Sequence, residues 1–105
     1  MSKNIFTSPD NFPKEFEYFQ PLIETDNLLI EKIVSTGQST PVDQWLEQDR
    51  DEWVILLQGK AVIRFEDDTV NNLNPGDYLF IQKNTKHRVE STSADPECIW
   101  IAVHF

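Results

Sequence analysis

Short apolar segments separated by turn residues run through most of the chain. They are rich in branched and aromatic residues, which favour β-strands over helices. They recur about every ten residues, a spacing typical of a small sandwich or barrel. The sequence therefore predicts an all-β protein. The expected strands are NLLIEKIVS (27–35), EWVILLQ (52–58), KAVIRFE (60–66), YLFIQ (78–82), HRVES (87–91) and CIWIAVHF (98–105).

Two of the turns between these segments have specific signatures. Pro75 and Gly76 suit the two central positions of a type II turn. The pair Gln58–Gly59 joins segments 52–58 and 60–66, and this spacing predicts a tight β-hairpin.

The N-terminal part of the chain is harder to interpret. The segment EFEYFQPLI (15–23) fits either a short helix or an edge strand, because its period does not decide between them. A chain of 105 residues supports one core and one domain. We expect residues 1–26 to form an N-terminal arm and a first edge element, and residues 27–105 to form the barrel.

Alternation along segment 52–58 separates two faces. If Glu52 points inward, Val54 and Leu56 do so too, and Trp53, Ile55 and Leu57 form an apolar row on the opposite face. A soluble protein would cover such a row with a second sheet, with the N-terminal arm or with another subunit. We take this row as the candidate surface for a homodimer.

Charge and cysteine content exclude several classes of protein. A net charge of −9 repels phosphate backbones, so nucleic acid and anionic membranes are not expected partners. The one cysteine, Cys98, lies beside IWIAV and is expected to be a buried, inert thiol. The N-terminus lacks a signal-peptide core, and no window approaches a membrane span, so we expect a cytoplasmic protein.

Two spaced motifs give the chain a family resemblance. Glu52 precedes Gly59 by six intervening residues, and Gly76 stands ahead of His87 in the segment PGDYLFIQKNTKHRV. With the strand rhythm on both sides, the block from Gly37 to about Ser91 resembles the cupin family. The resemblance implies a double-stranded β-helix, which is a barrel of the jelly-roll kind.

The resemblance also implies a metal site, but this chain keeps only part of it. Cupins hold a divalent metal with a His-x-His pair, a glutamate and a later histidine, and only Glu52 and His87 stand at such positions here. A third ligand would be Gln48, or alternatively Glu47 or Asp43. A divalent metal such as Mn, Fe, Ni or Zn is thus a candidate cofactor, and the short ligand set predicts low occupancy. No histidine occurs at the His-x-His positions in any of three registers, which are Asp43/Trp45, Leu46/Gln48 and Trp45/Glu47.

Each of these residues also has a structural interpretation. The acidic stretch 43–52 fits a solvated loop as well as a supplier of ligands. Glu52 could pair with Arg88 or Lys86, and His87 could be a hydrogen-bonded core histidine. We expect a structural role for His104. The tryptophans fit core or dimer packing, or an aromatic wall for a small ligand.

Three functions follow as hypotheses. The first is a protein that binds a small molecule, with or without a divalent metal, in the barrel cavity and has no assigned catalysis. The second is a metal-dependent enzyme such as a dioxygenase, isomerase or lyase. The third is a metal-free interaction module. The sequence contains no nucleophile motif and no phosphate-binding glycine loop, which narrows the enzyme options to metal chemistry or none. Whether the protein is an enzyme stays open.

Overall fold

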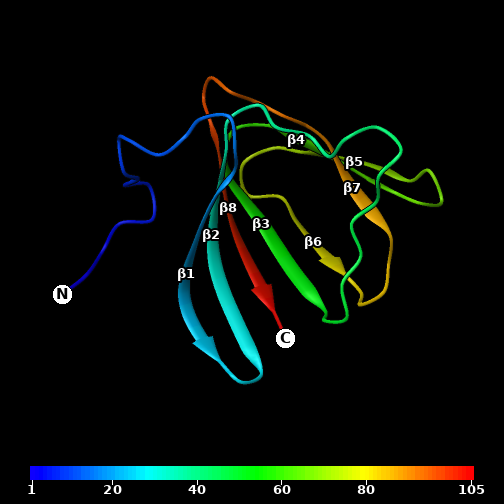
Figure 1. The fold of residues 1–105 in the computed structure, drawn as a ribbon, viewed down its shortest axis with the longest axis horizontal. Helices are drawn as coiled ribbons and strands as arrows, with labels where there is room; N and C mark the ends of the chain where they lie inside the picture. The colour runs from blue at the N-terminus through cyan, green and yellow to red at the C-terminus, as the bar shows by residue number, and fades with distance from the viewer.

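Eight β-strands in two antiparallel sheets form the protein in the computed structural model, which describes all residues, 1–105. The five-stranded sheet has the order β1-β2-β8-β3-β6, and the three-stranded sheet has the order β5-β4-β7. Figure 1 shows the five strands of the larger sheet side by side. The strands are β1 (Tyr18–Thr25), β2 (Leu28–Ser35), β3 (Glu52–Gln58), β4 (Ala61–Phe65), β5 (Val70–Leu73), β6 (Tyr78–Ile81), β7 (His87–Thr92) and β8 (Cys98–His104).

The prediction of an all-β protein is confirmed, and so are all six expected strands. The ambiguous segment 15–23 contributes to β1, which pairs with β2 at the edge of the larger sheet. Strand β5 was not expected, because its sequence VNNL has little β character between two turns. The structure contains no helix that could span a membrane.

The hairpin predicted at Gly59 is wrong. Strand β3 pairs with β6 and β8, whereas β4 pairs with β5 and β7, so the chain crosses from one sheet to the other here. Gly59 has a φ of +89°, and an added Cβ would lie 2.8 Å from both Cys98 Sγ and Ser93 Oγ. The glycine therefore permits a close crossing rather than a hairpin turn.

The type II turn predicted at Pro75 and Gly76 is supported by the backbone. Gly76 has a φ of +96°, as the third position of such a turn requires. The amide of Asp77 donates to the carbonyl oxygen of Asn74 at 2.9 Å and closes the turn.

Inward residues of both sheets form one hydrophobic core. On β3 the buried residues alternate as expected, with Val54 and Leu56 inside and Trp53 and Ile55 half-buried on the outer face. Cys98 is fully buried, as expected. The core consists of Val54, Leu56, Ala61, Ile63, Leu73, Ile81, Cys98, Trp100 and Ala102.

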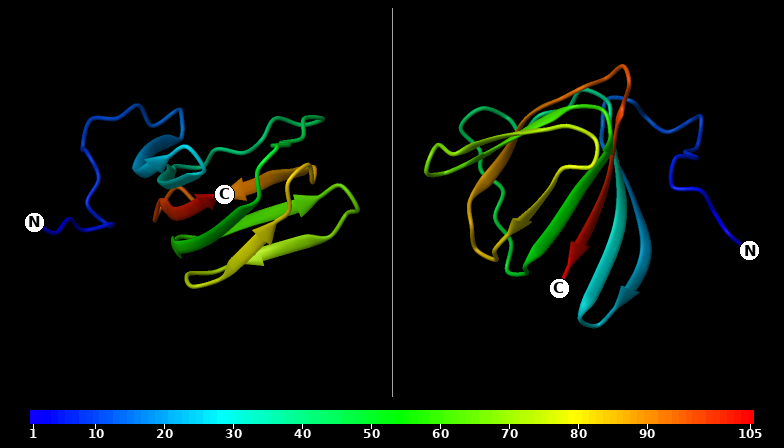
Figure 2. Two further views of the ribbon diagram at one scale, coloured as in Figure 1. Left: turned by 90° about the horizontal axis from the view of Figure 1, so that it is seen from below. Right: turned by 180° about the vertical axis from the view of Figure 1, so that it is seen from behind.

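The N-terminal segment runs outside the β1–β2 side of the molecule (Figure 2). The ammonium group of Lys32 donates to the carbonyl oxygen of Thr7 at 2.8 Å and to the hydroxyl of Ser8 at 2.9 Å. Phe12 is buried and stacks on Tyr18, with the ring centroids 5.1 Å apart. These contacts fasten the segment to the larger sheet.

Candidate functional site

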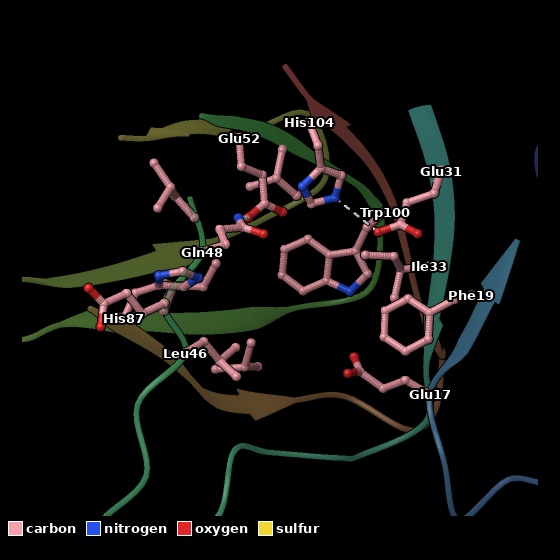
Figure 3. A pocket seen from close by; sticks show the side chains of 15 residues that line it. Glu17, Phe19, Glu31, Ile33, Leu46, Gln48, Glu52, His87, Trp100 and His104 are labelled. Carbon is pink, nitrogen blue, oxygen red and sulfur yellow. Dashed lines mark hydrogen bonds and ion pairs between the residues drawn. The ribbon is translucent and has the colours of Figure 1, made fainter. Parts of the chain in front are cut away.

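A cavity of about 300 Å³ is lined by residues from both sheets and from the loop that precedes β3. Figure 3 shows Gln48, Glu52 and His87 on one side of it, Glu17, Glu31 and Phe19 on the other, and Trp100 between them. The lining consists of Glu17, Phe19, Glu31, Ile33, Leu46, Glu47, Gln48, Glu52, Val54, Ile63, Ile81, His87, Val89, Trp100 and His104.

The cavity lies where the inward side chains of β3 and β8 change from apolar to polar. In the antiparallel register of these strands, Leu56 stands opposite Trp100 within the core. Four residue pairs further along, on the same inward face, Glu52 stands opposite His104. Strand alternation therefore places a carboxylate and an imidazole side by side at one end of the barrel.

Glu52 is buried and is held by the loop that precedes its strand. Its side chain belongs to a residue only 9% exposed. The side-chain amide of Gln48 donates to Glu52 Oε1 at 2.6 Å, and no group of the protein bonds Oε2. One oxygen of a buried carboxylate thus stays free within the cavity.

His87 begins β7 and is tied to the same loop. Its backbone exchanges two hydrogen bonds with Leu46, at N···O distances of 2.7 and 3.0 Å. Its Nδ1 lies 2.9 Å from the carbonyl oxygen of Thr85, which can only accept, so Nδ1 carries the proton. In the neutral ring Nε2 is then an acceptor, and no group of the protein bonds it. His87 is 5% exposed.

A second polar group joins His104, which lies beside Glu52, to Glu31 on the opposite wall. His104 Nε2 lies 3.0 Å from Glu31 Oε1, and both side chains are largely buried. The indole of Trp100 donates to Ser35 Oγ at 3.0 Å, and the Ser35 hydroxyl in turn donates to Glu17. These bonds fix the Trp100 ring in the cavity wall.

These further lining residues were not predicted from the sequence. His104 was expected to be structural, and the structure shows that it also lines the cavity. The alternation of Cys98, Trp100, Ala102 and His104, all buried on one face of β8, was a signal that could have identified it. Nothing in the sequence pointed to Glu17 or Glu31.

The predicted site residues mostly converge. Glu52, His87, Gln48 and Glu47 line one cavity, but Asp43 does not. Asp43 is exposed and has a φ of +71° in the turn that opens the loop.

The expected alternative partners of Glu52 are engaged elsewhere. Lys86 pairs with Glu66 at 3.6 Å, and Arg88 donates to the carbonyl oxygen of Thr40 at 3.0 Å.

The acidic stretch 43–52 has mixed roles. Asp51 exchanges backbone hydrogen bonds with Phe105, and its carboxylate accepts from the amide of Lys83 at 2.9 Å. The amide of Asn84 donates to the carbonyl oxygen of Gln48 at 2.7 Å. These hydrogen bonds hold the stretch against the residues that precede and begin β7. They thereby position the Gln48 side chain next to Glu52.

These residues do not fit a resident divalent metal of the kind the family resemblance implies. No group of three or more His, Cys, Asp or Glu is arranged to hold a metal ion. His87 offers one nitrogen, His104 is bonded to Glu31, and Gln48 contributes only an amide oxygen. Late transition metals prefer more nitrogen donors than this set supplies.

Comparison with solved structures gives a closely similar fold. A protein from Ralstonia eutropha JMP134, provisionally named a mannose-6-phosphate isomerase, is 38% identical, with a TM-score of 0.90 over 99% of this chain and 96% of that one. A cupin superfamily protein from Desulfitobacterium hafniense DCB-2 is 21% identical, with a TM-score of 0.76 over 90% of this chain and 82% of that one. The FeII form of HppE is 16% identical, with a TM-score of 0.71 over 86% of this chain and 50% of that one.

Sequence comparison identifies the family. No curated protein sequence matches the chain. The family model for the cupin domain matches residues 32–104, which span β2 to β8 and include Glu52, His87 and the loop between β2 and β3. The expected double-stranded β-helix fold is thereby confirmed, and the chain belongs to the cupin family.

Proposed function

We propose that the protein binds a small organic molecule in its barrel cavity, with Glu52, Gln48 and His87 as the polar contacts. The observation that carries this proposal is the free acceptor on each of two buried side chains, Glu52 Oε2 and His87 Nε2. Neither atom is fully buried, because the only fully buried side-chain nitrogen or oxygen without a partner is Arg88 Nε, so both are accessible to a ligand that donates hydrogen bonds.

The rest of the cavity suits the remainder of such a molecule. Eight of its 15 lining residues are hydrophobic. Ligand sites commonly combine apolar walls with a few convergent polar groups. The volume of about 300 Å³ is at the lower end for ligand sites, so the proposed ligand is small.

We do not extend the name of the Ralstonia protein to this chain. Mannose 6-phosphate carries a phosphate group, which proteins commonly bind with Arg or Lys. No Arg or Lys lines this cavity, whereas four glutamates do. The charge of the cavity therefore argues against a sugar phosphate, and we assign no catalysis.

The two other hypotheses are less well supported. A metal-dependent enzyme needs a resident metal, and the donor set of Glu52, Gln48 and His87 suits only weak binding. An interaction module without a ligand gives no reason for free acceptors within a largely apolar cavity.

The test is a ligand-observed NMR screen of small organic compounds of positive, neutral and negative charge. We expect hits that shift resonances of the cavity wall, such as the Trp100 indole NH. The variant Val54→Phe fills the cavity and should abolish binding. The matched control Val62→Phe adds the same bulk on β4 outside the cavity and should leave binding unchanged. Hits that bind equally to both variants, or no hits of any charge, would refute the proposal.

A further inference from the structure

We infer that the polar end of the cavity holds a protonated primary amine carried by a small apolar body. This inference rests on the proposed small-molecule function and specifies the chemical class of the ligand. It is argued from the hydrogen-bonding atoms that stay free on Glu52, Gln48 and His87, from the charge of the lining and from the apolar wall beside them.

Three acceptors converge at this end, each from a different side chain. Glu52 Oε1 already accepts from the Gln48 amide nitrogen, which leaves Glu52 Oε2 free and also leaves the carbonyl oxygen of Gln48 free. His87 donates through Nδ1 to Thr85, which leaves Nε2 as an acceptor. Figure 3 shows these three side chains close together on one side of the cavity. A primary ammonium has three N–H donors and no acceptor, so it matches this set in number and in kind.

The charge of the lining has the same sign throughout. Glu17, Glu31, Glu47 and Glu52 line the cavity, and no Lys or Arg does. Carboxylates are ordinarily ionised at neutral pH. The cavity therefore favours a cation and repels an anion.

Other ligand classes match less well. A hydroxyl group has one donor, so it would leave two of the three acceptors unpaired. A divalent metal would find one nitrogen, one carboxylate oxygen and a weak amide oxygen, which is a poor set for Mn, Ni or Zn. A carboxylate or phosphate would face acceptors and negative charge only.

The wall next to these acceptors fits an apolar body. Trp100 is buried, and its indole is held in place by the hydrogen bond to Ser35. Leu46 and Ile33 line the cavity on either side of it. An amine on a ring or short chain can pack on this surface while its ammonium reaches Glu52.

The experiment compares three probes of nearly equal size, which are benzylamine, benzyl alcohol and benzoate. Each is titrated into the intact protein at neutral pH, and the shift of the Trp100 indole NH reports binding. We expect benzylamine to bind at least about tenfold more tightly than benzyl alcohol, because its hydrogen bonds are charge-assisted. We expect no measurable binding of benzoate.

Two isosteric variants locate the ammonium. Glu52→Gln keeps the shape of the side chain and should weaken benzylamine about tenfold, while leaving benzyl alcohol within about twofold. The control Glu66→Gln changes an exposed carboxylate outside the cavity and should alter neither affinity. Unchanged dispersion of the amide spectrum verifies that each variant is folded.

Several outcomes would overturn the inference. Equal or tighter binding of benzyl alcohol or benzoate would assign a different ligand class and leave the proposed function standing. Benzylamine binding that is insensitive to Glu52→Gln would place the amine elsewhere. Mn or Zn that displaces benzylamine and binds through Glu52 and His87 would show that the acceptors serve a metal. Failure of all three probes would also reject the inference, and the wider screen with Val54→Phe then decides the proposed function separately.

Discussion

Leu46 and Gln48 occupy one of the registers considered for the His-x-His pair that the cupin resemblance implies. The sequence left three registers for the missing His-x-His pair. In the structure Leu46 and Gln48 both line the cavity, whereas Asp43 and Trp45 do not. The backbone bonds between Leu46 and His87 hold this register in place. The loop therefore places both residues at the cavity wall together with Glu52 and His87.

This register leads to a gain-of-function prediction. The double variant Leu46→His with Gln48→His should bind Zn or Ni at least about a hundredfold more tightly than the parent, because three imidazoles and Glu52 complete a four-ligand set. Titration calorimetry of metal-free protein is the measurement. The parent should bind these ions weakly, and His87→Ala should abolish that weak binding.

A register-shifted variant provides the control. Trp45→His with Glu47→His adds the same two imidazoles, but Trp45 lies outside the cavity lining. Its gain in affinity should be much smaller. Equal gains from both double variants would mean that the assigned register is wrong.

Some residues of the site could be predicted from local spacing in the sequence, and others depend on the pairing of distant strands. Glu52 and His87 stand at fixed distances from Gly59 and Gly76, so local spacing was sufficient. Glu17 and Glu31 reach the cavity only through the pairing of β1, β2 and β8. Register between distant strands depends on tertiary packing, which a single sequence does not display.

At the scale of elements, local pattern predicted strands well and their pairing poorly. The apolar runs that became β3 and β8 were recognised from composition and length. The crossing at Gly59 was mistaken for a hairpin, because a glycine between two apolar runs is compatible with either. Which is correct depends on the partners of β3, and these are β6 and β8, later in the chain.

The attachment of the N-terminal segment to β2 gives a prediction on pH. Burial lowers the pKa of Lys32 below its ordinary value of 10.5, and attraction to Glu97 partly opposes this. Between the lowered pKa and 10.5, the unfolded chain binds more protons at this group than the folded one. This group therefore makes the free energy of unfolding rise as pH increases through that window, up to the ordinary value.

Lys32→Met should remove this contribution. The free energy of unfolding is measured with urea at a mildly and at a strongly alkaline pH. The change between the two pH values should be less positive, or more negative, in Lys32→Met than in the parent. The variant should also be cut faster by protease near Thr7 and Ser8, whose bonds to Lys32 are lost. The exposed control Lys83→Met should resemble the parent in both measurements. An identical pH slope in parent and Lys32→Met would contradict the assignment.

At the scale of the whole molecule, the outer face of the larger sheet carries an apolar row across several strands. Ile30 pairs with Val103, Val103 with Trp53, and Trp53 with Phe80. Phe80 is 56% exposed, and Ile23, which pairs with Ile30, is 53% exposed. The N-terminal segment leaves these two residues exposed. We therefore still expect another surface to pack on Trp53 and its apolar neighbours.

We propose that a second copy of the chain covers this row. Light scattering at high micromolar concentration should give twice the mass of one chain, and Phe80→Lys should give the mass of one chain because a charge cannot be buried unpaired. Val42→Lys places the same charge on a loop residue that is 78% exposed, and should stay dimeric. A monomeric parent, or a dimer that tolerates Phe80→Lys, would refute the proposal.

Along β3 and β8 the inward side chains change from apolar core residues to polar cavity residues, and this division affects how such a barrel can evolve. Four residues, Val54, Ile63, Ile81 and Trp100, belong both to the core and to the cavity wall. The polar residues around them, including Glu52, Gln48 and His87, belong to the wall alone. Mutations of these polar wall residues change which ligand the cavity recognises, while most of the hydrophobic core stays intact. A lineage can thus lose one binding chemistry and gain another without passing through an unfolded intermediate.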